Sequence, residues 1–137
     1  MSVEGLSHIT LIVGNLARTA RLLTDVLGAR QIYASGNRTF STAPEMFFDV
    51  GGVWLAIMEG EPLPQRSYNH VAFKIPDAAF DDCLARVRAA GVDMREPRSR
   101  VAGEGRSIYF HDFDNHLFEL HTGTLSERLE RYAKAGP

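Results

Sequence analysis

The chain has 137 residues, of which 15 are basic and 17 acidic, so its formal net charge is −2, and its length fits one domain or two small halves that share a core. Hydrophobic residues make up 45% and charged residues 23% of the chain, values close to the globular average that argue against intrinsic disorder. The near-neutral charge argues against a nucleic acid partner, and no segment reads as a membrane span or secretory signal, so we expect a cytoplasmic protein without nucleic acid or membrane partners.

One sequence pattern occurs twice, the second copy 62 residues after the first. Residues 6–13 (LSHITLIV) align with residues 68–75 (YNHVAFKI), and both segments combine apolar and β-branched residues as strands do. Each segment carries a histidine at the same place, His8 in the first and His70 in the second. The chain is therefore predicted to contain two structural repeats, each of which begins with a strand that bears a histidine.

A helix is predicted after each of these strands. Asn15 and Asp77 stand where an N-cap is expected, and apolar residues follow both at helical spacing. Gly28 and Gly91 then suit the left-handed conformation that ends many helices. Asn15 and Asp77 are 62 residues apart, and the two glycines are 63 apart.

A pair of strands joined by a tight turn is predicted next in each half. In the first half, residues 46–50 and 53–58 flank Gly51 and Gly52, two residues that suit a two-residue hairpin. In the second half the corresponding strands are predicted at residues 108–112 and 115–120, still at an offset of 62. After them, Thr124 and Glu127 have the spacing of a capping box and predict a final short helix.

The predicted fold class is α+β, built from two βαβββ repeats in a single domain that covers residues 1–137. We expect the first repeat at about 4–59, a linker at about 60–67, the second repeat at about 68–123 and the C-terminal helix at about 124–133.

Three side chains at repeat-related positions predict a metal site. The offset makes Ile57 the counterpart of Glu119, so two paired half-barrels would bring positions 8, 57, 70 and 119 around one centre. Three of these positions are occupied by His8, His70 and Glu119. Two imidazoles and one carboxylate can hold a divalent metal and leave positions open for water or substrate, although the set alone does not choose among Mn, Fe, Co and Zn. The remaining histidines are expected to be structural or to lie behind the ligands.

This architecture and ligand set resemble the vicinal oxygen chelate superfamily of glyoxalase-like metalloenzymes, whose final hairpin and carboxylate ligand are similar to residues 112–120 (DFDNHLFEL). Over nearly the whole chain the sequence resembles the fosfomycin resistance proteins. The segments that carry this resemblance are 6–10, 68–70, 105–110 and 119–125. Residues 39–41 followed by 45–48 resemble the branch of that family that hydrolyses the epoxide.

The resemblance implies a divalent metal, usually Mn²⁺, held by His8, His70 and Glu119. It also implies a homodimer that exchanges halves, so that each site takes His8 from one chain and the other two ligands from its partner. The implied reaction is hydrolysis of the epoxide of fosfomycin to a diol, with the metal as Lewis acid and Glu45 as the general base that activates water. Glu45 itself is expected in the loop before the third strand.

The resemblance also implies a set of residues around the substrate. Thr10, Ser107, Tyr109 and Arg128 are expected to contact the phosphonate, while Trp54 and Tyr68 are candidates for the cavity wall. Trp54 equally suits packing within its hairpin. Arg98 and Arg100 would add positive charge, and the sequence does not choose between them.

Two other functions remain open. The first is a fosfomycin thiol (glutathione) transferase, against which Glu45 and the altered loop at residues 99–105 argue. The second is a drug-binding protein without catalysis, which would not need a metal triad. The sequence does not identify the physiological substrate.

Overall fold

The structure, a computed structural model, describes residues 2–38, 42–97 and 105–136. Its contacts group into two compact units. The first unit comprises Met1–Gln65 together with Phe113–His116, and the second comprises Arg66–Asp112 together with Leu117–Pro137. The main boundary falls between Gln65 and Arg66, and Phe113–His116 of the second predicted repeat group with the first unit.

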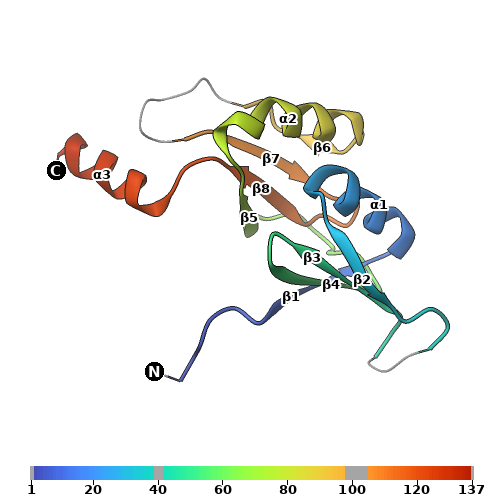
Figure 1. The fold of residues 1–137 in the computed structure, drawn as a ribbon. Coiled ribbons are helices and arrows are strands. Elements are labelled where there is room, and N and C mark those ends of the chain that lie inside the picture. The colour runs from blue at the N-terminus through green and yellow to red at the C-terminus, as the bar shows by residue number, and fades with distance from the viewer. Residues whose placement is uncertain (1, 39–41, 98–104, 137) are drawn as a thin grey trace. The chain divides into compact units, whose positions relative to one another are not determined.

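The first unit is a four-stranded mixed sheet with one helix (Figure 1). Its strands follow the order β1-β4-β3-β2, with β1 parallel to β4 and the other neighbours antiparallel. The elements are β1 (His8–Val13), α1 (Leu16–Leu27), β2 (Arg30–Ala34), β3 (Glu45–Val50) and β4 (Val53–Glu59).

Helix α1 begins and ends as the sequence predicts. The side chain of Asn15 accepts a hydrogen bond from the backbone N–H of Arg18 at 2.9 Å, which satisfies one of the free donors of the first turn. Gly28 closes the helix with φ of 64°, a left-handed conformation that costs glycine little. Leu23 and Val26 are buried on the face of the helix that packs against the sheet.

The second unit repeats this arrangement with the strand order β5-β8-β7-β6, in which β5 is parallel to β8. Its elements are β5 (His70–Lys74), the 3-10 helix η1 (Asp77–Ala79), α2 (Phe80–Ala89), β6 (Asp93–Met94), β7 (Ser107–His111), β8 (Leu117–His121) and α3 (Leu125–Ala135). Thr124 accepts a hydrogen bond from the backbone N–H of Glu127 at 3.1 Å, which confirms the predicted start of α3. The helix runs two residues beyond the predicted end near residue 133.

The prediction that Asp77 caps the second helix is wrong. Asp77 begins η1, and α2 follows from Ala79 without a side-chain cap. The carboxylate of Asp77 instead accepts a hydrogen bond from Nε of Arg106 at 3.3 Å. Because this partner lies 29 residues away, local sequence spacing did not reveal the use of the carboxylate. Gly91 does take the predicted left-handed conformation, with φ of 71°.

The second hairpin is one residue longer than the first, so the predicted constant offset of 62 residues does not hold beyond its turn. In the first hairpin Asp49 pairs with Trp54, and in the second the corresponding His111 pairs with Leu117. The second strand of that hairpin therefore starts at Leu117 and not at residue 115. The pairs Phe47–Ala56 and Tyr109–Glu119 make Ala56 the structural counterpart of Glu119.

Ile57, which the sequence offset predicted as the counterpart of Glu119, lies on the face of the first sheet opposite to Ala56 and is fully buried. The four positions 8, 57, 70 and 119 therefore do not form a symmetric set. Three of the four still carry the predicted ligands, so the error concerns the symmetry argument alone.

Strand alternation gives each sheet one apolar and one polar face. The apolar face of the first unit buries Phe48, Leu55 and Ile57, and that of the second buries Ile108, Phe110, Phe118 and Leu120. Register places His8 and Thr10 on the other face of the first sheet, and His70, Tyr109 and Glu119 on the other face of the second. Within the residues described, no helix has both the length and the apolar character that crossing a membrane requires.

We expect Phe118→Ala to cost about 3–5 kcal/mol of unfolding free energy, because it empties a fully enclosed aromatic site. The ring of Phe118 is 2% exposed and stacks on Phe110 with centroids 5.5 Å apart. Ile32→Ala is the control, since Ile32 is 50% exposed and its truncation should cost less than about 1 kcal/mol. Urea denaturation followed by circular dichroism measures both, and equal losses would contradict this view of the core.

Candidate metal centre

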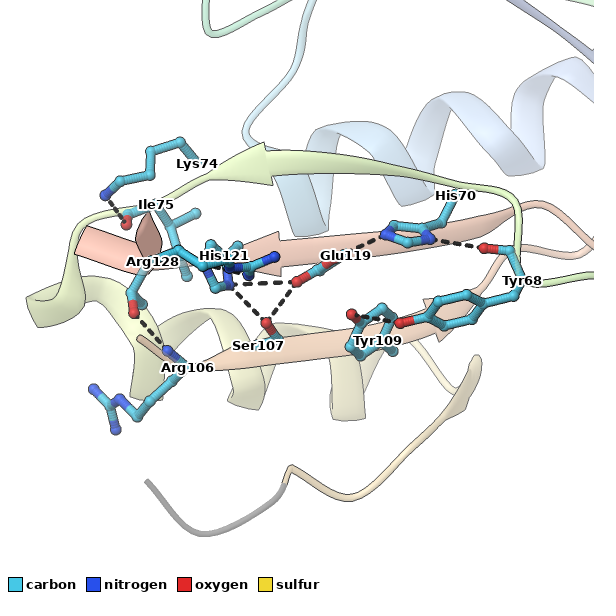
Figure 2. A network of polar contacts seen from close by, with 11 residues as sticks. Tyr68, His70, Lys74, Ile75, Arg106, Ser107, Tyr109, Glu119, His121 and Arg128 are labelled. Carbon is cyan, nitrogen blue, oxygen red and sulfur yellow. Dashed lines mark hydrogen bonds and ion pairs between the residues drawn. The ribbon is translucent and has the colours of Figure 1, made fainter. Parts of the chain in front are cut away.

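His70 and Glu119 lie on neighbouring strands, β5 and β8, and face one another (Figure 2). Nε2 of His70 is 3.0 Å from Oε1 of Glu119. Nδ1 of His70 is 2.7 Å from the backbone carbonyl of Tyr68, which can only accept, so Nδ1 carries a proton and donates it. Nε2 of His70 and Oε1 of Glu119 thus point at one another, and each can offer a lone pair to a cation bound between them. A divalent metal fits this pair of donors.

His8 has a matching orientation in the first unit. Its Nδ1 is 2.9 Å from the hydroxyl of Ser7, and its ring lies against Trp54 with centroids 4.2 Å apart. A partner at Nδ1 fixes the ring and leaves Nε2 for another ligand, as is usual for metal-binding histidines. The ring contact also places Trp54 beside His8, on the same face of the sheet.

No group of three His, Cys, Asp or Glu side chains in the described ranges is placed to hold a metal ion. Two of the three predicted ligands, His70 and Glu119, lie in the second unit. The third predicted ligand, His8, lies in the first unit.

Glu119 has two further neighbours on its other side (Figure 2). The hydroxyl of Ser107 lies 2.5 Å from Oε2 of Glu119 and 2.7 Å from Nδ1 of His121. Nη2 of Arg128 lies 3.4 Å from Nε2 of His121, so α3 adds a guanidinium to the same cluster. Of the predicted phosphonate contacts, Ser107 therefore bonds directly to the carboxylate, and Arg128 is linked to it through His121.

Tyr68 and Tyr109 form a second pair on this face, with hydroxyl oxygens 3.0 Å apart. Burial raises the pKa of the Tyr109 phenol, and its hydrogen bonds to Tyr68 and Glu119 raise that pKa further. Tyr109 therefore stays protonated at neutral pH and can act as a hydrogen-bond donor. Both tyrosines were expected near the substrate.

Arg95 is a basic residue beside these tyrosines that the sequence analysis missed. Its guanidinium carbon lies 5.7 Å from the ring centroid of Tyr68 and 5.6 Å from that of Tyr109, within the range of cation–π attraction. Its backbone N–H also bonds to the carbonyl of Tyr109 at 3.0 Å. A basic residue directly after the short strand β6 was the only sequence signal, and it had no motif to support it.

Glu45 is buried at the start of β3, so the expectation of a loop position is wrong. It is 9% exposed and pairs with Met58 in the sheet. Ser35 also bonds to the backbone of Glu45. The Glu45 N–H donates to the Ser35 hydroxyl at 2.9 Å, and the Ser35 N–H donates to the Glu45 carbonyl at 3.0 Å. The register puts Glu45 on the same face of the first sheet as His8 and Thr10.

Some predicted residues lie outside the described ranges. These are Arg98 and Arg100, the loop that continues to residue 104, and residues 39–41 of the segment that precedes Glu45.

Three comparisons with known proteins agree with this architecture. The family model of the Glyoxalase/Bleomycin resistance protein/Dioxygenase superfamily matches residues 5–120. The fosfomycin resistance protein FosX of Mesorhizobium japonicum is 61% identical, in an alignment that covers 96% of this chain and 95% of that protein. The metallothiol transferase FosB of Staphylococcus epidermidis is 37% identical, with 98% of this chain and 95% of that protein covered.

A crystal structure of a mutant FosX from Listeria monocytogenes has a TM-score of 0.85 and 52% sequence identity, with 95% of this chain and 98% of that chain covered. That crystal contains Mn(II) and 1S,2S-dihydroxypropylphosphonic acid. The similarity confirms the predicted fold class.

Proposed function

This chain belongs to the Glyoxalase/Bleomycin resistance protein/Dioxygenase superfamily and, within it, to the fosfomycin resistance proteins, and from this we propose that it is a Mn(II)-dependent enzyme that hydrolyses the epoxide of fosfomycin. The observation that carries the proposal is the complex of the similar FosX with Mn(II) and a dihydroxypropylphosphonic acid. That compound is a vicinal diol, the product expected when water opens an epoxide on a propylphosphonate. Hydrolysis removes the strained ring and would thereby protect the cell from the antibiotic.

We propose that His8, His70 and Glu119 hold the Mn(II) ion. Their donor types suit the metal, and the Nδ1 partners of both histidines leave Nε2 available. A bound Mn(II) ion would act as a Lewis acid on the epoxide oxygen and stabilise the negative charge that develops when the ring opens.

Glu45 is the proposed general base for the attacking water. Its burial and its place on the face that carries His8 support this role, because a carboxylate on a strand is held more firmly than one on a loop. Taking a proton from water as the new C–O bond forms makes the water a stronger nucleophile.

The phosphonate needs hydrogen-bond donors and positive charge. We assign Thr10, Ser107, Tyr109 and Arg128 to this task, and Arg98 and Arg100 remain candidates for added charge. Trp54 and Tyr68 are the proposed cavity wall, which their ring contacts with His8 and His70 support.

We also propose that the active protein is a homodimer that exchanges halves. The second unit supplies two ligands, so the third has to come from a first unit, in the same chain or in a partner. Strands β1 and β5, which carry the two histidines, each lie at the edge of a sheet. Open edges and an exposed strand face are typical of surfaces that bind a second chain.

We propose that the protein acts in the cytoplasm, where its single cysteine, Cys83, stays reduced.

The test is incubation of the Mn(II)-loaded protein with fosfomycin, with and without glutathione, followed by phosphorus NMR. We expect the diol as the main product in both reactions. A thiol adduct as the main product would assign the chain to the transferase chemistry of FosB, whose similarity to this chain keeps that alternative open. Bound but unchanged fosfomycin would favour the drug-binding alternative.

A further inference from the structure

Ser35 bonds to the proposed base, Glu45, at the end of the ladder between β2 and β3. It directly follows β2, which ends at Ala34, and Glu45 is the first residue of β3. The Ser35 N–H donates to the Glu45 carbonyl at 3.0 Å, and the Glu45 N–H donates to the Ser35 hydroxyl at 2.9 Å. Both bonds are made by the backbone of Glu45, and neither uses its carboxylate.

The role of the hydroxyl follows from a turn that begins at Ser35. In an antiparallel ladder, two facing residues of a hydrogen-bonded pair donate their N–H groups to each other's carbonyls. The carbonyl of Ser35 instead accepts from the N–H of Arg38 at 3.0 Å, in a turn in which Gly36 has φ of 60°. The serine hydroxyl thus takes the place of that carbonyl as the acceptor for the N–H of Glu45.

The pairing with β4 shows why this N–H depends on Ser35. Glu45 pairs with Met58, and the next pair along the ladder is bonded, because the N–H of Glu59 donates to the carbonyl of Pro44 at 3.0 Å. Bonded and non-bonded pairs alternate along an antiparallel ladder. The N–H and the carbonyl of Glu45 therefore point away from β4 and toward Ser35.

Burial makes the hydroxyl costly to remove. Ser35 is 6% exposed and Glu45 is 9% exposed, so little water is available to replace the serine oxygen. Without that oxygen a buried N–H loses its acceptor, and the first residue of β3 has to shift to find another. A general base acts only within hydrogen-bond reach of the water that it activates, so a small shift of Glu45 lowers the rate.

We propose that Ser35 is a positioning residue for the general base: its hydroxyl holds the start of β3 so that the carboxylate of Glu45 meets the attacking water. This inference rests on the proposed function, in which Glu45 activates water. Because the hydroxyl acts through the backbone of Glu45, its contribution should appear in kcat and not in KM or in Mn(II) affinity.

Three substitutions of Ser35 test the inference in the Mn(II)-loaded protein. Ser35→Ala should lower kcat for diol formation roughly 10-fold, while the KM for fosfomycin and the affinity for Mn(II) stay unchanged. Ser35→Thr keeps the hydroxyl and should restore most of kcat. Ser35→Cys nearly keeps the size of the side chain but is a weak acceptor, so it should also lower kcat and replaces the alanine variant if that does not fold. Phosphorus NMR measures diol formation.

The double variant Ser35→Ala/Glu45→Gln separates positioning of the base from a merely structural role. If Ser35 acts through the carboxylate, its removal should cost no further rate once Glu45 is replaced by glutamine. Asn15→Ala is the control for lost stability, since the Asn15 side chain also accepts a backbone N–H, at the start of α1. It should lower the thermal midpoint as Ser35→Ala does and leave kcat unchanged.

The inference is overturned if Ser35→Ala forms the diol with the original kcat, or if it lowers the rate as much in the Glu45→Gln background as in the unchanged protein. It is also overturned if Asn15→Ala loses as much kcat as Ser35→Ala, or if Ser35→Thr folds but does not restore kcat. Failure of the proposed function is a different result: an unchanged protein that forms no diol refutes hydrolysis and leaves no general base for Ser35 to position.

Discussion

Glu45→Gln should lower diol formation by roughly 100-fold or more while the protein continues to bind Mn(II) and phosphonate. Glutamine keeps the size and the neutral hydrogen-bonding capacity of the side chain, but it cannot take a proton from water. The backbone bonds to Ser35 do not involve the carboxylate, so β3 should keep its position. Product formation at saturating Mn(II), followed by phosphorus NMR, measures the effect.

Addition of glutathione provides the internal control for this substitution. A thiolate forms without help from Glu45, so any thiol adduct that the protein makes should fall much less than the diol. Asp49→Asn is the matched control, because Asp49 is a half-buried carboxylate on the same strand and face and pairs with Arg30 at 3.2 Å. Diol formation by Glu45→Gln at nearly the original rate would mean that another group activates the water.

The second large effect is expected at the metal. His70→Ala and Glu119→Ala should each abolish tight Mn(II) binding and with it hydrolysis. Each variant keeps only two of the three protein ligands, and two ligands do not bind the ion tightly. Isothermal titration with Mn(II) measures this, and circular dichroism shows whether each variant is folded. Normal titration curves for both variants would refute the ligand assignment.

Mixing variants then tests whether halves are exchanged between chains. His8→Ala and Glu119→Ala proteins should each be inactive alone, but a heterodimer in which halves are exchanged contains one site with all three ligands intact. Part of the activity should therefore return after the subunits have been unfolded and refolded together. Refolded mixtures that contain heterodimers by native mass spectrometry but stay inactive would favour sites built within one chain.

The fold was largely predictable because its local signals are strong. Asn15 and Gly28 marked both ends of α1, as the structure confirms. These features depend on residues close in sequence, where propensity and capping dominate. The position of Glu45 was missed because its pairing with Ser35 and Met58 depends on the neighbouring strands.

The length of the second hairpin could not be predicted because its turn is fixed by tertiary contacts. Asp114 is fully buried in this turn, where its carboxylate accepts from the N–H of Gly14 at 2.9 Å. Its carbonyl accepts from the N–H of Leu63 at 3.2 Å. These partners are distant in sequence, whereas the local pattern suggested a two-residue turn. The link between Ser107 and His121 was missed for the same reason, since it crosses from β7 to β8.

The additional residue in the second hairpin also bears on how such a protein can change by insertion and deletion. Side chains alternate along β8, so a shift of one residue against β7 would turn Glu119 into the apolar core and bring Phe118 or Leu120 to the polar face. A second hairpin as short as the first would place Phe118 opposite Tyr109, where the carboxylate of Glu119 now lies. The number of residues in the turn before β8 thus determines whether Glu119 lies on the polar face of its sheet.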